Sequence, residues 1–435
     1  MITMKQINAS VAEEREAFFQ LLDERTGETN QRVTETVQEI LKTVKASGDD
    51  AVKNYTLKFD GSLPEYYEVP REVINDALTD ADQAFVDAML NAIENVRDFH
   101  QCQVEQGFIH PMANGVILGQ RVRGLERVGL YVPGGTAAYP SSVIMNAVPA
   151  KIAGVKEIIM VTPPRKDGTP NPDILIAAAL CGVDRIFLSG GAQAIAALAY
   201  GTKEIPKVDK IVGPGNIYVA TAKKLLYGIV DIDMIAGPSE VLVMADETAN
   251  PVFAAADLMS QAEHDVMASS ILVTTSEKLA EQVQAEINRQ VQTLERKEII
   301  EKSMNTYGAI LLCNSREEAT ALANRVAPEH LEVLMENPME LLGALDNAGS
   351  VFLGQYASEP LGDYYAGPNH VLPTSGTARF FSPLGVASFT KRSSYTYYTK
   401  DALRAAKDDI VLIANREGLT AHANAITVRF EDEKE

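Results

Sequence analysis

The stretch that decides the fold reads RIFLSGGAQAIAALAY and runs from Arg185 to Tyr200. Its first four residues are a short, mainly apolar run, SGGAQ at 189–193 is rich in glycine, and the remainder is rich in alanine. A short buried strand, a tight turn and a helix produce this order of residue types. The stretch therefore predicts one βα unit.

The same pattern recurs along the chain from Arg127 onward. Strands are predicted in the apolar, β-branched runs at 128–132, 157–162, 185–188, 210–212 and 241–245, and then at 270–274, 309–313 and 349–353. Helices are predicted between them at 142–153, 172–181, 192–200, 218–225, 277–294 and 316–326. Strands that alternate with helices at this pace form parallel sheets covered on both faces. We therefore expect an α/β protein with two Rossmann-like parallel-sheet domains and helical N- and C-terminal extensions.

The two ends of the chain have a different pattern. Residues 1 to about 110 read as helical, including Thr34–Ala46 and a long amphipathic stretch from Arg71 to His100. A further helix is expected at Lys400–Asn415. These segments read as scaffold around the two sheets.

Composition excludes several classes of partner. The formal net charge of -20 argues against binding to nucleic acid or to an anionic membrane, since both require clustered Lys and Arg. The longest uncharged stretch, 128–150, is interrupted by proline and glycine, and the N-terminus lacks the pattern of a secretory signal. We therefore expect a soluble cytoplasmic protein with a small, neutral or cationic substrate.

The three cysteines, Cys102, Cys181 and Cys313, are far apart and odd in number, which fits a reducing compartment without a disulfide framework. Cys181 and Cys313 lie in apolar runs and read as buried small hydrophobic residues. A nucleophilic cysteine that forms a thioester during aldehyde oxidation is the alternative. It ranks below the structural interpretation because neither run supplies positive neighbours for a thiolate.

Glycine-rich loops follow three of the predicted strands, VPGG at 132–135, SGGAQ at 189–193 and VGPGN at 212–216. Glycines at strand ends allow close backbone approach to a ligand, and helix N-termini favour phosphate. The dinucleotide fingerprint is not met, because Tyr218 stands where its third glycine should fall. Taken alone, the loops fit tight turns as well as a cofactor site.

A second candidate site begins in DLMSQAEHD at 257–265. Gln261 and His264 are three residues apart and would share one face of a helix. His264, His330, His370 and His422 each lie near a carboxylate or in a turn, which indicates one shared site. Gln261, His264, Asp363 and His422 together offer two imidazoles, one carboxylate and one amide oxygen, a set of ligands that suits Zn²⁺ first, and Mn²⁺ or Co²⁺ next.

Nine segments distributed in order between residues 30 and 430 make the sequence resemble one family. They are GLYVPGG, GGAQAIAALAYGT, KVDKIVGPGN, AGPSEVLV, SQAEHD, APEHLE, GSVFLG, GDYYAGPNHVLPT and LTAHANA. The chain is similar in all of them to the histidinol dehydrogenases. The resemblance is weakest before residue 30.

The resemblance implies a role for each matched position. It implies a zinc site of Gln261, His264, Asp363 and His422, with one Zn²⁺ per subunit, and an acid/base pair of Glu329 and His330. It implies substrate contacts from Ser239, His370 and Glu417, besides the zinc ligands and His330. It implies NAD contacts from Tyr131, Gln193 and Asn216.

The resemblance also implies the reaction and the assembly. Histidinol dehydrogenases oxidise L-histidinol through L-histidinal to L-histidine, the last step of histidine biosynthesis, with two NAD⁺ and a water. The family's C-terminal tail completes the site of a second subunit, so a homodimer with shared active sites is expected. The domains then expected are an N-terminal extension at 1–30, a first α/β domain with the metal and acid/base residues at 31–126 plus 240–380, an NAD-binding domain at 127–239, and a tail at 381–435.

Alternatives exist for the function and for single residues. A zinc- and NAD-dependent dehydrogenase of another small alcohol, such as a sulfonated diol, would differ at the imidazole-binding end, at Glu417 and His370. A zinc hydrolase would not need the glycine loops. Without the resemblance, Glu329 reads as a surface residue, Asp363 as the start of a turn and Ser239 as a helix N-cap.

Overall fold

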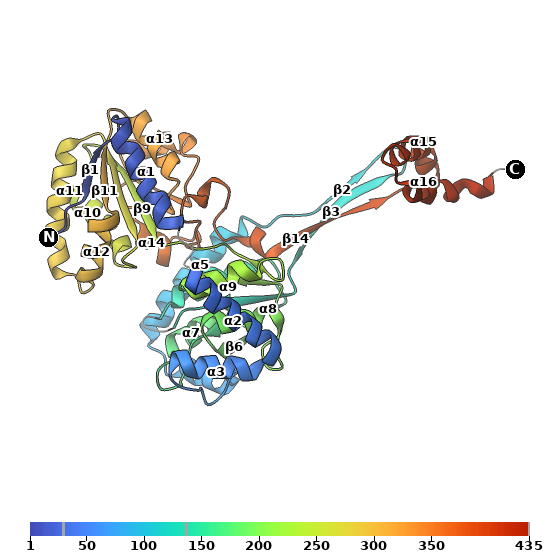
Figure 1. Cartoon of the computed structure of the whole chain (residues 1–435), viewed down its shortest axis with the longest axis horizontal. Coiled ribbons are helices and arrows are strands. Elements are labelled where there is room, and N and C mark those ends of the chain that lie inside the picture. Colours follow the sequence, from blue (N-terminus) through green and yellow to red (C-terminus); the bar gives the residue numbers. More distant parts are fainter. Residues whose placement is uncertain (28–30, 135–137, 434–435) are drawn as a thin grey trace. The chain divides into compact units, whose positions relative to one another are not determined.

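The computed structural model describes residues 1–27, 31–134 and 138–433, and the chain forms two compact units (Figure 1). The first consists of Met1–Gln103 and Leu125–Phe389, and the second of Val104–Gly124 and Thr390–Glu435. The first unit contains one six-stranded and one five-stranded sheet, and every strand pair in them is parallel. The predicted α/β class with two parallel sheets is therefore confirmed.

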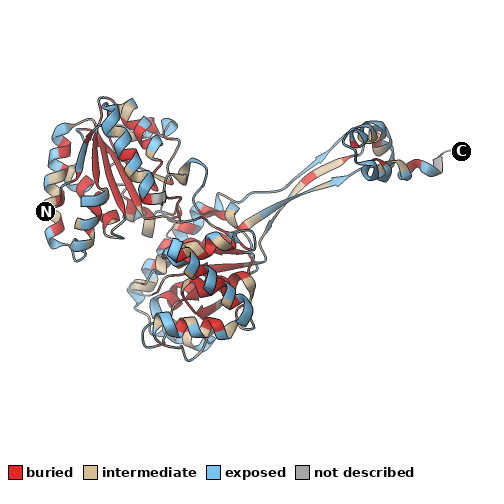
Figure 2. Ribbon diagram, viewed as in Figure 1, coloured by how far each residue is buried: buried red, intermediate tan, exposed pale blue. Residues whose placement is uncertain are grey.

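The five-stranded sheet is built from the stretch quoted first and its neighbours. Its strands lie in the order β6 (Arg185–Leu188), β5 (Glu157–Thr162), β4 (Arg127–Tyr131), β7 (Lys210–Val212) and β8 (Asp231–Ile232). The helices that follow successive strands are α6 (Pro140–Ile152), α7 (Pro172–Leu180), α8 (Gly191–Tyr200) and α9 (Ile217–Leu226). The sheet is almost wholly buried because helices cover both faces, as Figure 2 shows. This explains why its strands read as continuous apolar runs.

Four N-terminal helices also pack on this sheet, which differs from the expected grouping of 31–126 with 240–380. They are α2 (Gln31–Ser47), α3 (Asp49–Asp60), α4 (Arg71–Thr79) and α5 (Gln83–Gln101). Val37 and Ile40 of α2 join one core cluster with Ile159 of β5, while Ile93 of α5 joins another with Met145 of α6. The apolar stripe of each helix is therefore buried against the alanine-rich helices of this sheet.

The expected single helix from Arg71 to His100 is two helices. The chain leaves α4 at Asp80, and Asp82 caps α5 by accepting a hydrogen bond from the Ala84 backbone N–H at 3.1 Å. Aspartate favours this N-cap position because its short side chain reaches an unpaired backbone donor.

The six-stranded sheet has strands from both ends of the first unit's sequence. In order they are β1 (Lys5–Asn8), β11 (Ala309–Leu312), β10 (Ser269–Thr274), β9 (Glu240–Ala245), β12 (His330–Leu334) and β13 (Ser350–Leu353). One face packs on α10 (Pro251–Ala262), α11 (Glu277–Gln290) and α12 (Lys297–Tyr307), and the other on α1 (Ala12–Gly27) and α13 (Arg316–Val326). Alternate residues of β9 point to opposite faces of the sheet. Val241 and Val243 pack on the first face, and Leu242 and Met244 pack on the second.

The expected helical extension at 1–30 is wrong in one respect, since it begins with the edge strand β1. Four residues of mixed polarity gave no recognisable strand pattern, but Ile7 is buried and the strand pairs with β11 from Lys5 opposite Ala309. The helix α1 that follows is an integral layer of the six-stranded sheet region.

The second unit is an antiparallel ribbon that leads into helices. Its strands lie in the order β14 (Thr390–Tyr397), β3 (Ile117–Gly124) and β2 (Phe108–Pro111), and they are followed by α15 (Lys400–Arg416), α16 (Thr420–Thr427) and the 3-10 helix η5 (Val428–Glu433). The predicted helix at 400–415 is confirmed, while β14 shows that the C-terminal extension is not helical throughout. Within the described ranges, none of the helices combines the length and apolar character of a membrane span.

Candidate active site

The predicted acid/base residues lie at the amino end of the six-stranded sheet. His330 is the first residue of β12 and stands opposite Val241 of β9, one residue beyond Glu240. Glu329 immediately precedes β12, and Gln261 lies in the last turn of α10, which returns the chain to this same edge. The site is thus assembled where neighbouring strands begin, at the edge opposite to the one at which α/β sheets usually bind ligands.

The imidazole of His330 is fixed in one tautomer. Its Nδ1 lies 3.0 Å from the main-chain carbonyl oxygen of Glu240, which can only accept, so Nδ1 carries the proton. Its Nε2 is buried and has no hydrogen-bond partner among the described residues. Burial lowers the pKa of His330 to about 3, below the near-neutral value expected of a catalytic base, so the ring is neutral with a free lone pair.

Glu329 is held by the same main-chain residue. Its Oε2 accepts a hydrogen bond from the Glu240 backbone N–H at 2.9 Å and lies 3.7 Å from His330 Nδ1. Burial raises the pKa of Glu329 well above its ordinary value. The surface interpretation of Glu329 is wrong, because only 9% of the residue is exposed.

Gln261 presents an unpaired oxygen beside this pair. Its amide nitrogen lies 3.4 Å from both Glu329 Oε2 and the Glu240 carbonyl oxygen, which fixes the amide's orientation. Its Oε1 is buried and accepts no hydrogen bond from any described residue. A buried carbonyl oxygen without a donor is costly unless it binds something else, and a cation satisfies it.

Asp363 and two histidines of the first unit lie near this pair. Asp363 belongs to α14 (Glu359–Tyr364), and its Oδ1 lies 3.8 Å from His330 Nε2 and 3.8 Å from His370 Nδ1. His370 Nδ1 also contacts the Asp363 carbonyl oxygen at 3.1 Å. Burial lowers the pKa of His370 to about 4. His264 is exposed in the turn after α10.

Glu359 also lies at this site, although it was not among the site residues predicted from the sequence. Ligand atoms of Glu359, Asp363 and His330 all lie within 4.8 Å of one another, a spacing that a metal ion could bridge. Burial raises the pKa of Glu359 to about 8 and that of Asp363 to about 6, so the two adjacent carboxyl groups are hard to ionise together without a cation. Their i,i+4 spacing, which puts them on one helix face, was the available signal.

Three of the predicted substrate and metal residues lie apart from this cluster in the sequence. Ser239 directly precedes β9, so it is not a helix N-cap, and its carbonyl oxygen accepts from the Ser269 N–H at 3.0 Å. Glu417 is the C-cap residue that follows α15, and His422 lies in α16. Both belong to the second unit and are exposed there.

The predicted cofactor residues lie at the carboxyl end of the five-stranded sheet. Tyr131 ends β4, and its hydroxyl accepts a hydrogen bond at 3.1 Å from the Gly191 N–H, at the start of α8. Gln193 in the first turn of α8 is buried, and its Oε1 has no partner among the described residues. The structure thus joins the loops after β4 and β6. Gly135, the last residue of VPGG, is outside the described residues.

The third loop packs on the first through a glycine. A Cβ at Gly213, whose φ is +114°, would lie 2.1 Å from the Tyr131 carbonyl oxygen. The buried pair of Lys223 and Asp233 holds this loop, because Lys223 donates to the Gly213 carbonyl oxygen at 3.0 Å and Asp233 accepts from the Gly213 N–H at 2.8 Å. Asn216 caps α9 by accepting from two backbone N–H groups. The N-termini of α8 and α9 therefore lie at this edge, and a helix N-terminus favours an anion such as phosphate.

Cys181 and Cys313 are buried, as expected. Burial raises the pKa of Cys181 and of Cys313 to about 12, so neither is a thiolate at neutral pH.

Comparison with known proteins identifies the family of the chain. The family described as histidinol dehydrogenase matches residues 23–430. The chain belongs to the histidinol dehydrogenase family. Histidinol dehydrogenases of Clostridium acetobutylicum and Listeria innocua are 59% identical over 416 residues and 56% identical over 414 residues, respectively. The matches cover 96% of both chains for the first, and 95% of this chain and 97% of the relative for the second.

A solved structure extends the agreement to three dimensions. The crystal structure of histidinol dehydrogenase from Elizabethkingia anophelis superposes with a TM-score of 0.93, at 38% identity and over 100% of each chain. The protein is therefore an oxidoreductase of histidine biosynthesis. This family membership disfavours a zinc hydrolase.

Gly213 offers a test of how tightly the cofactor loops are packed in this histidinol dehydrogenase. Gly213→Ala should unfold at a clearly lower urea concentration than the wild type, because its Cβ would collide with the Tyr131 backbone. The matched control is Gly228→Ala, at φ +97° with nothing within 4 Å of its Cβ. It should cost only about 1–2 kcal/mol of unfolding free energy from the left-handed backbone, and Gly213→Ala at least twice that. Equal losses in the two variants would contradict the close packing.

Proposed function

We propose that the protein is a zinc-dependent histidinol dehydrogenase that oxidises L-histidinol to L-histidine in two NAD-linked steps. The observation that carries the proposal is a neutral, buried His330 with a free Nε2, directly beside Glu329 and the unpaired oxygen of Gln261. Alcohol oxidation requires a proton acceptor, and the second step requires activation of water. This pair of side chains supplies both.

In the first oxidation His330 removes a proton from the substrate hydroxyl. The hydroxyl loses its proton to Nε2 as the carbinol carbon loses hydride, and the product is the aldehyde. Nδ1 keeps its proton and donates to the Glu240 carbonyl oxygen, which partly offsets the positive charge that develops on the ring. The low pKa of His330 keeps the ring neutral before the reaction, so Nε2 is unprotonated when the substrate binds.

In the second oxidation Glu329 removes a proton from the water that adds to the aldehyde. The hydrated aldehyde then loses a proton and a second hydride and becomes the carboxylic acid. A carboxylate whose pKa is raised by burial is a stronger base than one in water, and Glu329 is in that environment. The 2.9 Å bond from the Glu240 N–H fixes its Oε2, so Oε1 is the atom that takes the proton.

The cofactors fit the residues that would hold them. Gln261, His264, Asp363 and His422 would hold one Zn²⁺ per subunit, which when bound orients the substrate through its amine and imidazole nitrogens. The unpaired Gln261 Oε1 and the crowded carboxyl groups support a cation there. Tyr131, Gln193 and Asn216 would contact NAD⁺, the acceptor of both hydrides. The unpaired Gln193 Oε1 and the two helix N-termini support it.

The substrate contacts and the assembly follow from the same reasoning. Ser239, His370 and Glu417 would contact L-histidinol, with Glu417 on the far side of its imidazole. Glu417 and His422 come from the second unit, which exposes large apolar side chains, among them Ile109, Leu412 and Ile413. We infer that a partner subunit covers these side chains, so that the protein is a homodimer with shared active sites. Its proposed location is the cytoplasm.

A single-turnover experiment tests the four-electron reaction. One L-histidinol should yield two NADH, followed by absorbance, with little free aldehyde. Glu329→Gln should slow aldehyde oxidation more than alcohol oxidation, whereas His330→Ala should slow both, each by about 10²- to 10⁴-fold. A yield of one NADH with accumulating aldehyde would show that the reaction stops after two electrons.

Metal removal tests the zinc site. Chelation should abolish turnover while circular dichroism stays unchanged, because the cores of both sheets do not depend on the ion. His264→Ala should weaken zinc binding, measured by competition with a chromogenic chelator, by more than about 10-fold. His110→Ala, at an exposed position of β2, serves as the control and should bind zinc as the wild type does. Full activity of metal-free enzyme would rule the site out.

Complementation tests the shared site. Inactive His330→Ala and inactive His422→Ala subunits should regain about one quarter of wild-type activity when they are unfolded and refolded together. Random pairing makes half of the dimers mixed, and each mixed dimer has one intact site. Mixed dimers that form but stay inactive would place His422 in the site of its own chain.

A further inference from the structure

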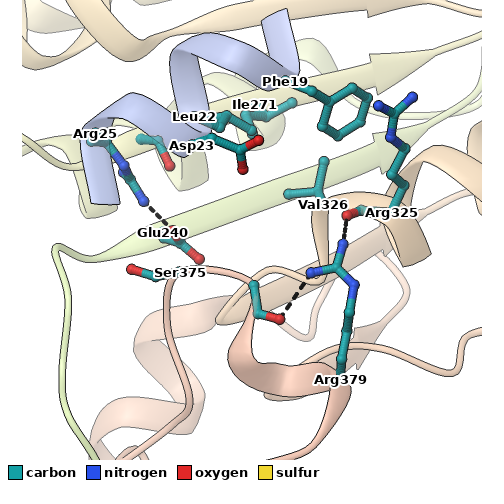
Figure 3. A pocket seen from close by; sticks show the side chains of 12 residues that line it. Phe19, Leu22, Asp23, Arg25, Glu240, Ile271, Arg325, Val326, Ser375 and Arg379 are labelled. Atoms are coloured by element: carbon teal, nitrogen blue, oxygen red, sulfur yellow. Dashed lines mark hydrogen bonds and ion pairs between the residues drawn. The ribbon is translucent and has the colours of Figure 1, made fainter. Parts of the chain in front are cut away.

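A buried ion pair is connected to the acid/base residues through Glu240. Arg25, near the end of α1, reaches the carboxylate of Glu240 at the start of β9 (Figure 3). The side chains are 1% and 8% exposed, and Arg25 Nη1 also donates to the Met267 carbonyl oxygen at 3.1 Å. The two partners are 215 residues apart in the sequence, so the pair ties the N-terminal helix to the centre of the six-stranded sheet.

The main chain of Glu240 bonds to the side chains of both Glu329 and His330. Its N–H donates to Glu329 Oε2 and its carbonyl oxygen accepts from His330 Nδ1. The same carbonyl oxygen also lies 3.4 Å from the Gln261 amide nitrogen. Any rotation of the peptide groups on either side of Glu240 would therefore move both groups that exchange protons with the substrate.

Glu240 is the first residue of β9, where a strand is held by fewer ladder bonds than at its centre. On one side the neighbouring peptide is held by β10, since the Ser269 N–H donates to the Ser239 carbonyl oxygen at 3.0 Å. The ion pair with Arg25 holds the Glu240 side chain in addition. A buried ion pair contributes little net stability, since desolvation of both charges offsets their attraction. A contribution to stability therefore does not account for an arginine at this position.

We propose that Arg25 is a positioning residue for the acid/base pair, acting through the side chain and main chain of Glu240. This inference rests on the proposed function and deepens it. Arg25 touches neither substrate nor cofactor, so its effect should fall on the rate of the chemical steps and not on binding.

A cavity of about 300 Å³ beside the pair makes a sharp test possible. It is lined by Phe19, Leu22, Asp23, Arg25, Glu240, Ser269, Ile271, Arg325, Val326, Ser375, Gly376 and Arg379. Truncation of Arg25 would enlarge this space next to Glu240. A small guanidinium ion could then enter and bind the Glu240 carboxylate, in place of the missing side chain.

The experiment compares Arg25→Ala with the wild type and adds methylguanidinium. In Arg25→Ala, kcat for L-histidinol oxidation should fall about 10- to 100-fold, while KM for L-histidinol and for NAD⁺ changes less than about 3-fold. Methylguanidinium at millimolar concentration should recover a large part of kcat. Unchanged kcat, or a change confined to KM, would overturn the proposal.

Arg325→Ala is the matched control. Arg325 lines the same cavity, but its guanidinium pairs with Glu16 and packs over the ring of Phe19. Its kcat should stay at the wild-type value and should not respond to methylguanidinium. A similar loss and rescue in Arg325→Ala would mean that general loosening of the cavity, and not the tie to Glu240, sets the rate.

A double variant covers the case in which Arg25→Ala does not fold. Arg25→Met with Glu240→Gln removes both charges and leaves no unpaired ion, so it should fold. Its kcat should remain reduced although its melting temperature is close to that of the wild type. A double variant with wild-type kcat would overturn the proposal, whereas a wild-type enzyme that is inactive on L-histidinol would refute the proposed function instead.

Discussion

The structure of the site depends on the main chain of one residue, Glu240. Its two peptide groups bond to Glu329 and His330, which lie on a different segment, and its side chain bonds to a third segment in α1. Parallel strands make this possible, because β9 and β12 are neighbours and begin at the same edge. Backbone groups are rigid hydrogen-bonding partners, so the acid/base pair has a geometry that the sheet determines.

The sequence predicted the regular core well because its signals are local. Strands at 157–162, 185–188 and 210–212 have the bounds of β5, β6 and β7, since buried parallel strands are short, β-branched and bounded by turns. The sequence did not predict β12, because Glu332 interrupts its apolar run. Glu332 is nevertheless fully buried and accepts a 2.7 Å bond from the Glu359 N–H, a partner that no local pattern reveals. Most of the ribbon in the second unit is exposed and has no apolar alternation to recognise.

Residues of the site could be predicted where they lie in family motifs, and could not be predicted elsewhere. Glu329, His330, Gln261 and Asp363 stand in such motifs, and the structure gathers these four into one cluster. Arg25 lies where the resemblance is weakest and makes its contact across 215 residues, so neither motif nor spacing pointed to it. The pKa of His330 could not be predicted from the sequence either, because it depends on burial by segments distant in the chain.

The edge strand β1 has a consequence for how the chain folds. Lys5 pairs with Ala309, so the six-stranded sheet joins two strands that are synthesised about three hundred residues apart. The five-stranded sheet, in contrast, draws all its strands from 127–232. Contacts between distant residues carry a large loop-closure cost and form slowly. During synthesis the five-stranded sheet should therefore close first, and the N-terminal strand should wait unpaired until β11 emerges.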